Sequence, residues 1–153
     1  MARPTKSIVH LAAEELRARL RGTNTAKQFG FVLDDVAPGR AVMSMEVDDR
    51  HKQVHGVVHG GVLAALADTA GGLATYMAVP RGQRVATIEM KINYLEGVAG
   101  GTVTADARVV RRGRHIAVVD CDVHGDDGTL VGKALMTFFV GPFPTNSGKK
   151  RNR

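Results

Sequence analysis

The chain has 153 residues, of which 44% are hydrophobic and 5% aromatic, and it carries a formal net charge of +6. This length suits one domain with a core of aliphatic side chains, and the one cysteine, Cys121, excludes an internal disulfide. No apolar run reaches the roughly 20 residues that a membrane span needs, and the stretch "MARPTKSIVHLAAEELRARL" lacks the apolar segment of a signal peptide. We therefore expect a cytoplasmic protein without a membrane span.

The positive charge raises the question of nucleic-acid binding. Its distribution argues against that class of partner, because four basic residues fall in the last five positions: Lys149, Lys150, Arg151 and Arg153. Such an end is typical of a disordered basic tail, which we expect over residues 141–153. A second basic cluster lies inside the domain, at Arg111, Arg112 and Arg114. It would suit an anionic small molecule such as a nucleotide or coenzyme A.

The first expected element is an amphipathic helix over residues 7–22. Residues 23–28, "TNTAKQ", are interpreted as a linker, so that residues 1–28 form an N-terminal helix and linker ahead of the main domain. Two strands follow at 29–36 and 41–47, joined by a turn at "APGR".

Residues 62–77 predict the central helix of the fold. This segment is rich in Ala and Leu, Pro80 follows it, and apolar residues surround it almost completely, which is typical of a buried helix. Gly71 and Gly72 each weaken an isolated helix by roughly 1 kcal/mol relative to Ala. Their presence indicates a requirement of packing or of access.

Four strands are expected after this helix, at residues 87–94, 103–110, 115–124 and 130–140. Each alternates with the period of a strand, and "EGVAGG", "RRGR" and "GDDG" supply the turns between them. Hairpin spacing predicts an antiparallel meander in this order. The fold class is therefore α+β, with one curved antiparallel sheet around one buried helix over residues 29–140.

The start of the central helix, "HGG", is a candidate binding site. The first backbone N–H groups of a helix lack intrahelical partners and carry partial positive charge. Gly60 and Gly61 let a ligand approach these groups closely. The helix start can thus bind an anion, or a carbonyl oxygen that becomes anionic during a reaction. The alternative is that the two glycines only permit a tight turn.

Asp68 is a lone carboxylate within this apolar helix. A buried Asp is costly unless it is hydrogen-bonded, paired or used, and burial disfavours its charged form, which raises its basicity. It lies about two helical turns from the first amides, at about 1.5 Å per residue, too far to act on the same atom within one chain. A site shared between two subunits would remove this difficulty. The alternative is a structural Asp held by Thr69 or by a neighbouring strand.

Three motifs occur in order: "VHGGVLAALADTAGGLA", "TIEMKINYLEG" and "VVRRGRHIAVVDCDVHGDDGTLVGKALMTF". Over residues 29–140 the sequence resembles the hotdog-fold acyl-CoA thioesterases, in particular the phenylacetic-acid-degradation type, with 4-hydroxybenzoyl-CoA thioesterase as a relative. The resemblance implies a helix wrapped by an antiparallel sheet. It also implies a homodimer with two sites at its interface, paired again into a homotetramer. The implied reaction converts an acyl-CoA and water to a carboxylic acid and coenzyme A, with no metal or other cofactor.

The resemblance also implies roles for individual residues. Asp68 matches the family's catalytic carboxylate, acting as general base toward water or as nucleophile. Gly60 matches the residue whose backbone N–H polarises the thioester carbonyl from the partner subunit, and His59 matches the motif histidine that supports this loop. Thr87 matches a Ser/Thr that orients the water. Gln53 stands where many members of this branch carry Asn, although Gln occurs there in the hydroxybenzoyl-CoA relative.

Other residues are candidates for substrate binding. His55 and Gly61 lie in the loop that would contact the substrate, Gly72 would line an acyl channel, and the arginines would bind the coenzyme A phosphates: Arg111, Arg112 and Arg114. The plainer alternatives are a surface histidine for His55, a solvated turn for the arginines and a strand position without a role for Thr87.

Two further side-chain patterns are given a structural interpretation. A metal site at His51, His55 and His59 is not expected, because "GVV" between them favours an extended loop over a helix. Cys121 alternates with strand residues and has no evident base partner, so we expect it to be inert core.

Two other functions compete with hydrolysis. One is a non-catalytic acyl-CoA-binding module or regulator on the same fold, which calorimetric binding without turnover would reveal. The other is a hotdog dehydratase, which would hydrate an enoyl-CoA, although the "HGG…AD" arrangement fits that chemistry poorly. Aromatic, medium-chain and long-chain acyl groups remain alternatives for the substrate.

Overall fold

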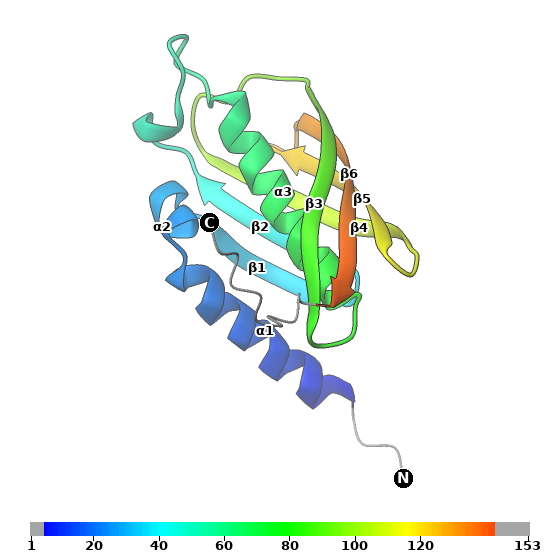
Figure 1. The fold of residues 1–153 in the computed structure, drawn as a ribbon. Helices are drawn as coiled ribbons and strands as arrows, with labels where there is room; N and C mark the ends of the chain where they lie inside the picture. Colours follow the sequence, from blue (N-terminus) through cyan, green and yellow to red (C-terminus); the bar gives the residue numbers. More distant parts are fainter. Residues whose placement is uncertain (1–4, 143–153) are drawn as a thin grey trace, which may run out of the picture.

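Six antiparallel strands form one sheet that curves around a single long helix (Figure 1). The computed structural model describes residues 5–142, with side chains from residue 13 onward. The elements, in chain order, are α1 (Thr5–Gly22), α2 (Asn24–Phe29), β1 (Val32–Ala37), β2 (Arg40–Glu46), the short 3-10 helix η1 (Asp49–His51), α3 (Gly60–Met77), β3 (Gln83–Tyr94), β4 (Thr102–Arg112), β5 (Ile116–His124) and β6 (Leu130–Pro142). The predicted α+β architecture is confirmed. The expected tail at 141–153 lies almost wholly outside the described residues.

The helix α3 packs one face against the concave side of the sheet. Its buried residues recur in adjacent pairs every four positions: Val62, Leu63, Leu66, Ala67, Ala70, Gly71, Ala74 and Thr75. Burying one large aliphatic side chain contributes roughly 1.5–3 kcal/mol, so this face holds α3 in place. A Cβ at Gly71 would lie 2.6 Å from Met136 Cε, so the missing side chain lets α3 approach β6. The opposite face, which includes Asp68 and Gly72, is only partly covered in one chain.

The strand order differs from the predicted meander. It is β1-β2-β4-β5-β6-β3, so β3 pairs with β6 instead of β4. The reason is that α3 crosses the concave face after β2 and delivers β3 to the far edge of the sheet. Residues 95–101 then return to β4, which lies three strand spacings away, or roughly 14 Å. Seven extended residues span up to about 25 Å, so this connection is long enough. The Val58 N–H donates to the Val98 carbonyl (2.8 Å) and fixes this return beside the start of α3.

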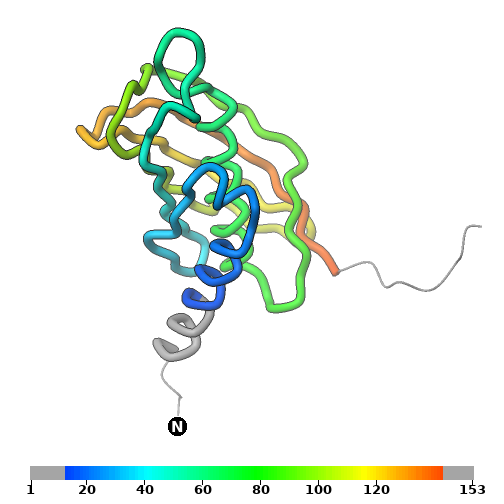
Figure 2. The backbone as a smooth tube through the Cα atoms, turned by 90° about the vertical axis from the view of Figure 1, so that its left-hand side faces the viewer, coloured from blue at the N-terminus to red at the C-terminus, as the bar shows by residue number. Residues whose placement is uncertain are grey.

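The expected linker at 23–28 is a short helix, α2. Thr23 caps its first turn by accepting the Ala26 N–H (3.2 Å), and Gly30 ends it in the left-handed conformation at φ 68°. Thr and Gly are preferred at the start and just after the end of a helix, so Thr23 and Gly30 are the features of the sequence that indicate α2. Phe29 therefore ends a helix, and β1 begins three residues later than predicted. Both backbone views place α1 beside β1 (Figures 1 and 2), where Arg17 donates to the carbonyls of Leu33 and Asp34. Within the described part of the chain, no helix is both long and apolar enough to cross a membrane.

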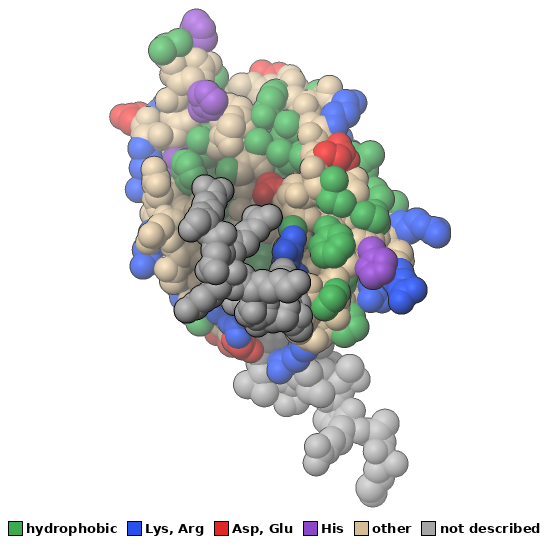
Figure 3. All heavy atoms as spheres, in the orientation of Figure 1, with side chains coloured by type: hydrophobic (Ala, Val, Ile, Leu, Met, Phe, Trp, Pro, Cys, Tyr) green, Lys and Arg blue, Asp and Glu red, His purple; other side chains and the backbone are tan. Residues whose placement is uncertain are grey.

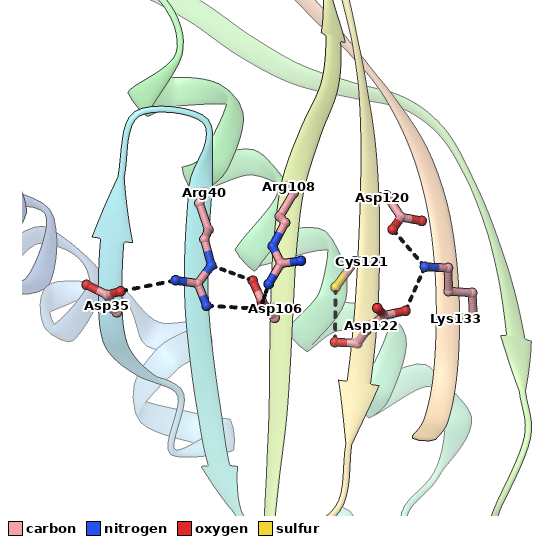
Figure 4. Close-up of polar contacts among 8 residues, drawn as sticks. All are labelled: Asp35, Arg40, Asp106, Arg108, Asp120, Cys121, Asp122 and Lys133. Atoms are coloured by element: carbon pink, nitrogen blue, oxygen red, sulfur yellow. Dashed lines mark hydrogen bonds and ion pairs between the residues drawn. The ribbon is translucent and has the colours of Figure 1, made fainter. Parts of the chain in front are cut away.

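The convex side of the sheet carries paired charges (Figure 4). Arg40 makes two hydrogen bonds to the Asp106 carboxylate, of 2.9 and 3.0 Å, and Lys133 bridges Asp120 and Asp122 at 2.7 Å each. Partial burial works to raise the pKa of Asp106, but the hydrogen bond and charge of Arg40 outweigh it and leave that pKa lowered. These charges are matched within the chain, so they form a solvated face and not a catalytic site.

Candidate active site

The first turn of α3 leaves one backbone amide free. His59 caps the helix: its Nδ1 accepts the Gly61 N–H (2.9 Å), and its carbonyl accepts those of Val62 (2.9 Å) and Leu63 (3.4 Å). Among the described residues, no group accepts the Gly60 N–H. Since an unpaired amide at a helix start is suited to a carbonyl oxygen that gains charge, Gly60 is the donor that the helix offers. The amide of Gly61, by contrast, is already occupied.

The hydrogen bond to Gly61 also fixes the tautomer of His59. Because Nδ1 accepts a backbone N–H, the proton of the neutral ring sits on Nε2. The residue is exposed, so this second N–H is available to a ligand. His59 therefore supports the helix start with one nitrogen and can donate with the other.

A small hairpin precedes α3. At its base, the His59 N–H donates to the His51 carbonyl (2.8 Å). In its turn, the Gln53 side-chain oxygen accepts the His55 N–H (2.9 Å). His51 is buried and its Nδ1 accepts the Asp48 N–H (3.0 Å). The tip is free, with Val54 95% exposed. This hairpin projects beyond the start of α3 (Figure 1), so one chain does not bring Gln53 or His55 into the cavity at Asp68.

Asp68 is held by the neighbouring strand. Its Oδ1 accepts the Thr87 hydroxyl at 2.8 Å, whereas the Thr69 hydroxyl donates to the Ala65 carbonyl instead. The prediction of a buried Asp68 is wrong for a single chain, because Asp68 lies on the partly covered face of α3. Among the described residues, its Oδ2 has no partner and can accept a proton or bind water.

A β-bulge explains why Thr87 faces α3. The sequence alternation groups Thr87 with the outward-facing Glu89, but the ladder to β6 shifts register between these two residues and leaves Ile88 as the extra one. Met90, after the bulge, and Val85, before it, both pack toward the core. An unbroken alternation would place these two residues on opposite faces. Bulges often re-aim side chains next to active sites. Ile88, which the alternation places in the core, is 54% exposed.

Asp68 and Thr87 open into a cavity of about 450 Å³, in a hollowed face of the molecule (Figure 3). Gly72 lines it, and a Cβ there would make an ordinary contact of 3.7 Å with Phe138; that Gly72 lines an acyl channel stays a prediction. Packing within the chain therefore does not require glycine at this position. The remaining physical reason for a glycine at position 72 is that it leaves the cavity open to a ligand.

Tyr94 was not identified from the sequence. Its ring lies against Gly60, where a Cβ would be only 2.9 Å from Tyr94 Cζ. Tyr94 and Gly60 line a second cavity, of about 380 Å³, together with Leu63 and Leu95. The chain has only two tyrosines, and the other one, Tyr76, lines the cavity at Asp68. The scarcity of tyrosine is the feature of the sequence that could have pointed to Tyr94.

The remaining candidates lie elsewhere. The three arginines are exposed, at the end of β4 and in the turn to β5, and neither cavity includes them: Arg111, Arg112 and Arg114. Burial raises the pKa of the Cys121 thiol to about 12, which suppresses the nucleophilic thiolate. Within residues 13–142 no three His, Cys, Asp or Glu side chains are arranged to hold a metal ion.

Comparison with known proteins identifies the family. Residues 55–132, just over half of the chain, match the model of the Thioesterase superfamily. A solved thioesterase from Haemophilus influenzae superposes with a TM-score of 0.81 at 29% identity, covering 89% of this chain and 94% of that one. The PaaI protein of the E. coli phenylacetic acid degradation operon gives 0.78 at 27%, covering 85% and 93%. Human acyl-coenzyme A thioesterase 13 is 26% identical over 135 residues, 84% of this chain and 96% of its own.

Two further neighbours concern the site. A hypothetical thioesterase protein from Streptococcus pneumoniae, solved with coenzyme A, has a TM-score of 0.70 at 28% identity, covering 76% of this chain and 90% of that one. A Staphylococcus aureus thioesterase was solved as two variants, both 29% identical to this chain. The glutamine-to-alanine variant gives a TM-score of 0.76 and covers 78% of this chain and 100% of that one. The glutamate-to-alanine variant gives 0.75 and covers 77% and 98%. The two substituted positions are 15 residues apart. Fold and sequence agree, and the chain belongs to the thioesterase superfamily as a hotdog-fold thioesterase.

Proposed function

We propose that the chain is an acyl-CoA thioesterase, which uses water to convert an acyl-CoA to a free carboxylic acid and coenzyme A. The observation that carries this proposal is the pair of half-sites on α3. One half-site offers the unpaired Gly60 N–H, and the other offers the Asp68 carboxylate held by Thr87 above an open cavity. Thioester hydrolysis needs these two functions, a donor for the developing oxyanion and a base for water.

The two half-sites belong to different subunits in this proposal. Asp68 lies eight residues beyond Gly60, about 12 Å along the helix axis, too far for one carbonyl group to contact both. The strand β3 is an edge of the sheet. If the free edges of two β3 strands pair antiparallel, the first half of one strand, with Thr87, lies opposite the second half of the other, with Tyr94 beside Gly60. A homodimer therefore completes two sites, and its further pairing into a homotetramer remains part of the proposal.

The reaction then follows from these groups. Asp68 takes a proton from water through its free oxygen, and the water oxygen attacks the thioester carbon. The carbonyl electron pair moves onto oxygen, where the partner's Gly60 N–H and the outer N–H of His59 stabilise it. Collapse of this intermediate breaks the carbon–sulfur bond and releases the coenzyme A thiolate, which takes up a proton. The alternative is direct attack by Asp68 on the thioester, which gives an anhydride that water hydrolyses. Neither route requires a cofactor.

The relatives support this assignment. The human one is named an acyl-coenzyme A thioesterase, and the S. pneumoniae one was solved with coenzyme A. Gln53 and Asp68 are separated by 15 positions, the same spacing as the glutamine and glutamate substituted in the S. aureus thioesterase. This match supports a site that contains both residues. The arginines at 111, 112 and 114 would meet the coenzyme A phosphates only on a surface formed by assembly.

The test is release of free thiol from a panel of acyl-CoAs. We expect Asp68→Asn to lower kcat by about 10²- to 10⁴-fold, the usual contribution of a general base. Asp122→Asn, on the convex face, is the matched control and should retain wild-type activity. Unchanged turnover in Asp68→Asn would overturn the role of Asp68. Calorimetric binding of acyl-CoA with no turnover by the wild type would indicate a binding module instead.

A further inference from the structure

The N-terminal helix forms part of the wall of the cavity at Asp68. This helix lies outside residues 55–132, which match the family model, yet Leu16 and Arg19 of α1 line the same cavity as Asp68 and Thr87. The cavity is therefore bounded by parts of the chain that the family match does not cover. If the chain is the proposed thioesterase, this boundary can limit the substrate that reaches Asp68.

The cavity extends along α3 from the carboxylate toward α1. Asp68, Gly72 and Tyr76 lie on successive turns of α3 and all line it. The last of them is about 12 Å from the first along the axis. Gly72 adds no side chain in the middle of this path. A linear group that starts at Asp68 thus has an open course to the end where α1 lies.

The side walls of the cavity are mainly apolar. They include Leu73, Val85 and Phe138. At the α1 end, Leu16 is 8% exposed and the guanidinium of Arg19 is paired with the Glu15 carboxylate. Arg84 also belongs to the lining, and its guanidinium lies 5.6 Å from the centroid of the Phe139 ring. The path from Asp68 toward Leu16 therefore suits an apolar chain.

We propose that this cavity holds the acyl group and that α1 limits its length, with Leu16 as the specificity-determining contact. An apolar acyl chain extends from the thioester at Asp68, past Gly72, until it meets Leu16. Selectivity then lies in an element outside the family-matched segment. Chains that share the catalytic residues but differ in their N-terminal helix would prefer different acyl lengths.

Two substitutions move the limit in opposite directions. Leu16→Ala shortens the side chain at the closed end, and Gly72→Ala narrows the path, where its Cβ is tolerated at 3.7 Å from Phe138. The control is Leu20→Ala, one turn further along α1, which removes an equally buried leucine (9% exposed) that does not line the cavity. Far-UV circular dichroism and melting temperature establish that each variant is folded.

The measurement is kcat/KM for straight-chain acyl-CoAs from acetyl to dodecanoyl. One methylene in an apolar pocket changes kcat/KM by about 10-fold or more. We therefore expect Leu16→Ala to raise the long-to-short ratio of kcat/KM by at least about tenfold and Gly72→Ala to lower it, while Leu20→Ala keeps the wild-type ratio. Equal ratios in wild type, Leu16→Ala and Leu20→Ala would overturn the role of α1 while leaving the thioesterase assignment intact. A wild-type protein that hydrolyses no acyl-CoA would overturn both.

Discussion

Gly60 combines a backbone function with a steric requirement. Its N–H is the amide that the His59 cap leaves unpaired, and the ring of Tyr94 occupies the space that a side chain would need. The first feature is open to many residue types, whereas the second favours glycine as long as the Tyr94 ring stays where it is. The aromatic ring thus fixes the position of the amide that is proposed to bind the carbonyl.

This arrangement predicts that Gly60 and Tyr94 are energetically coupled. Gly60→Ala pushes its Cβ into the Tyr94 ring and displaces the amide, and since loss of one oxyanion donor costs about 10²–10³ in kcat, we expect a fall of at least about tenfold. Tyr94→Phe should retain activity, because the ring carbons make the contact. In a Tyr94→Ala background, Gly60→Ala should cost less than it does alone. A double-mutant cycle in kcat measures this coupling, and additive effects would show that the ring has no such function.

At the scale of the element, β3 shows both the reach and the limit of prediction from sequence. Alternation identified a strand over 87–94, and the strand is there, extended backward to Gln83. Alternation by itself does not show which face Thr87 takes, because alternation assumes an unbroken ladder and the bulge at Ile88 arises from pairing with β6. Period-2 patterns describe one strand alone, whereas register depends on its neighbour.

The same distinction applies to the rest of the fold. The helix α3 and its chemistry were predicted because "HGG" and Asp68 lie on one continuous segment. The position of β3 beside β6, the ring of Tyr94 over Gly60 and the cavity wall from Leu16 depend on contacts between distant segments. Neither composition nor local spacing encodes such contacts directly.

The bulge can be tested by removing its extra residue. Deletion of Ile88 makes the pairs Thr87–Phe138 and Glu89–Thr137 consecutive, so Thr87 still faces α3 and Asp68 keeps its 2.8 Å hydrogen bond, whereas Thr87→Val removes that bond. A hydrogen bond to a charged group contributes about 1.5–3 kcal/mol. We therefore expect kcat to fall roughly 10- to 100-fold in Thr87→Val and to stay near the wild-type value in the Ile88 deletion. Ile88→Val keeps the chain length and serves as the control.

Steady-state kinetics on the folded variants decides between these outcomes. A fall of kcat in the Ile88 deletion to the level of Thr87→Val, with circular dichroism that shows an intact fold, would mean that pairing with β6 does not by itself keep Thr87 facing α3. Wild-type activity in Thr87→Val would mean that its hydrogen bond to Asp68 does not contribute to kcat. Either result would contradict the proposed link between strand register and carboxylate.

At the scale of the whole molecule, one chain carries two incomplete sites. The Gly60 amide with Tyr94 lies toward one end of β3, and Asp68 with Thr87 toward the other. A twofold axis across the free edge of β3 exchanges these ends, and such isologous pairing is the commonest form of homodimer. The proposed assembly is therefore part of the proposed chemistry, in which the amide of one chain and the carboxylate of the other act on the same thioester.

Mixed dimers of two inactive chains give the decisive prediction. One chain carries Asp68→Ala, which removes the base. The other chain carries Gly60→Pro, which removes the amide proton at the first helical position, where the backbone tolerates proline, together with Tyr94→Ala, which removes the ring that a Cβ at residue 60 would meet at 2.9 Å. His59 already has the extended conformation that a residue before proline requires, with φ −63° and ψ 133°. In a heterodimer of these variants, isolated with two affinity tags, the Gly60 of one chain meets the Asp68 of the other in one of the two sites. We expect each homodimer to be inactive and the heterodimer to recover about half of wild-type kcat, since one site of two is complete. If each site lay within a single chain, both sites of the heterodimer would be defective and no activity would return.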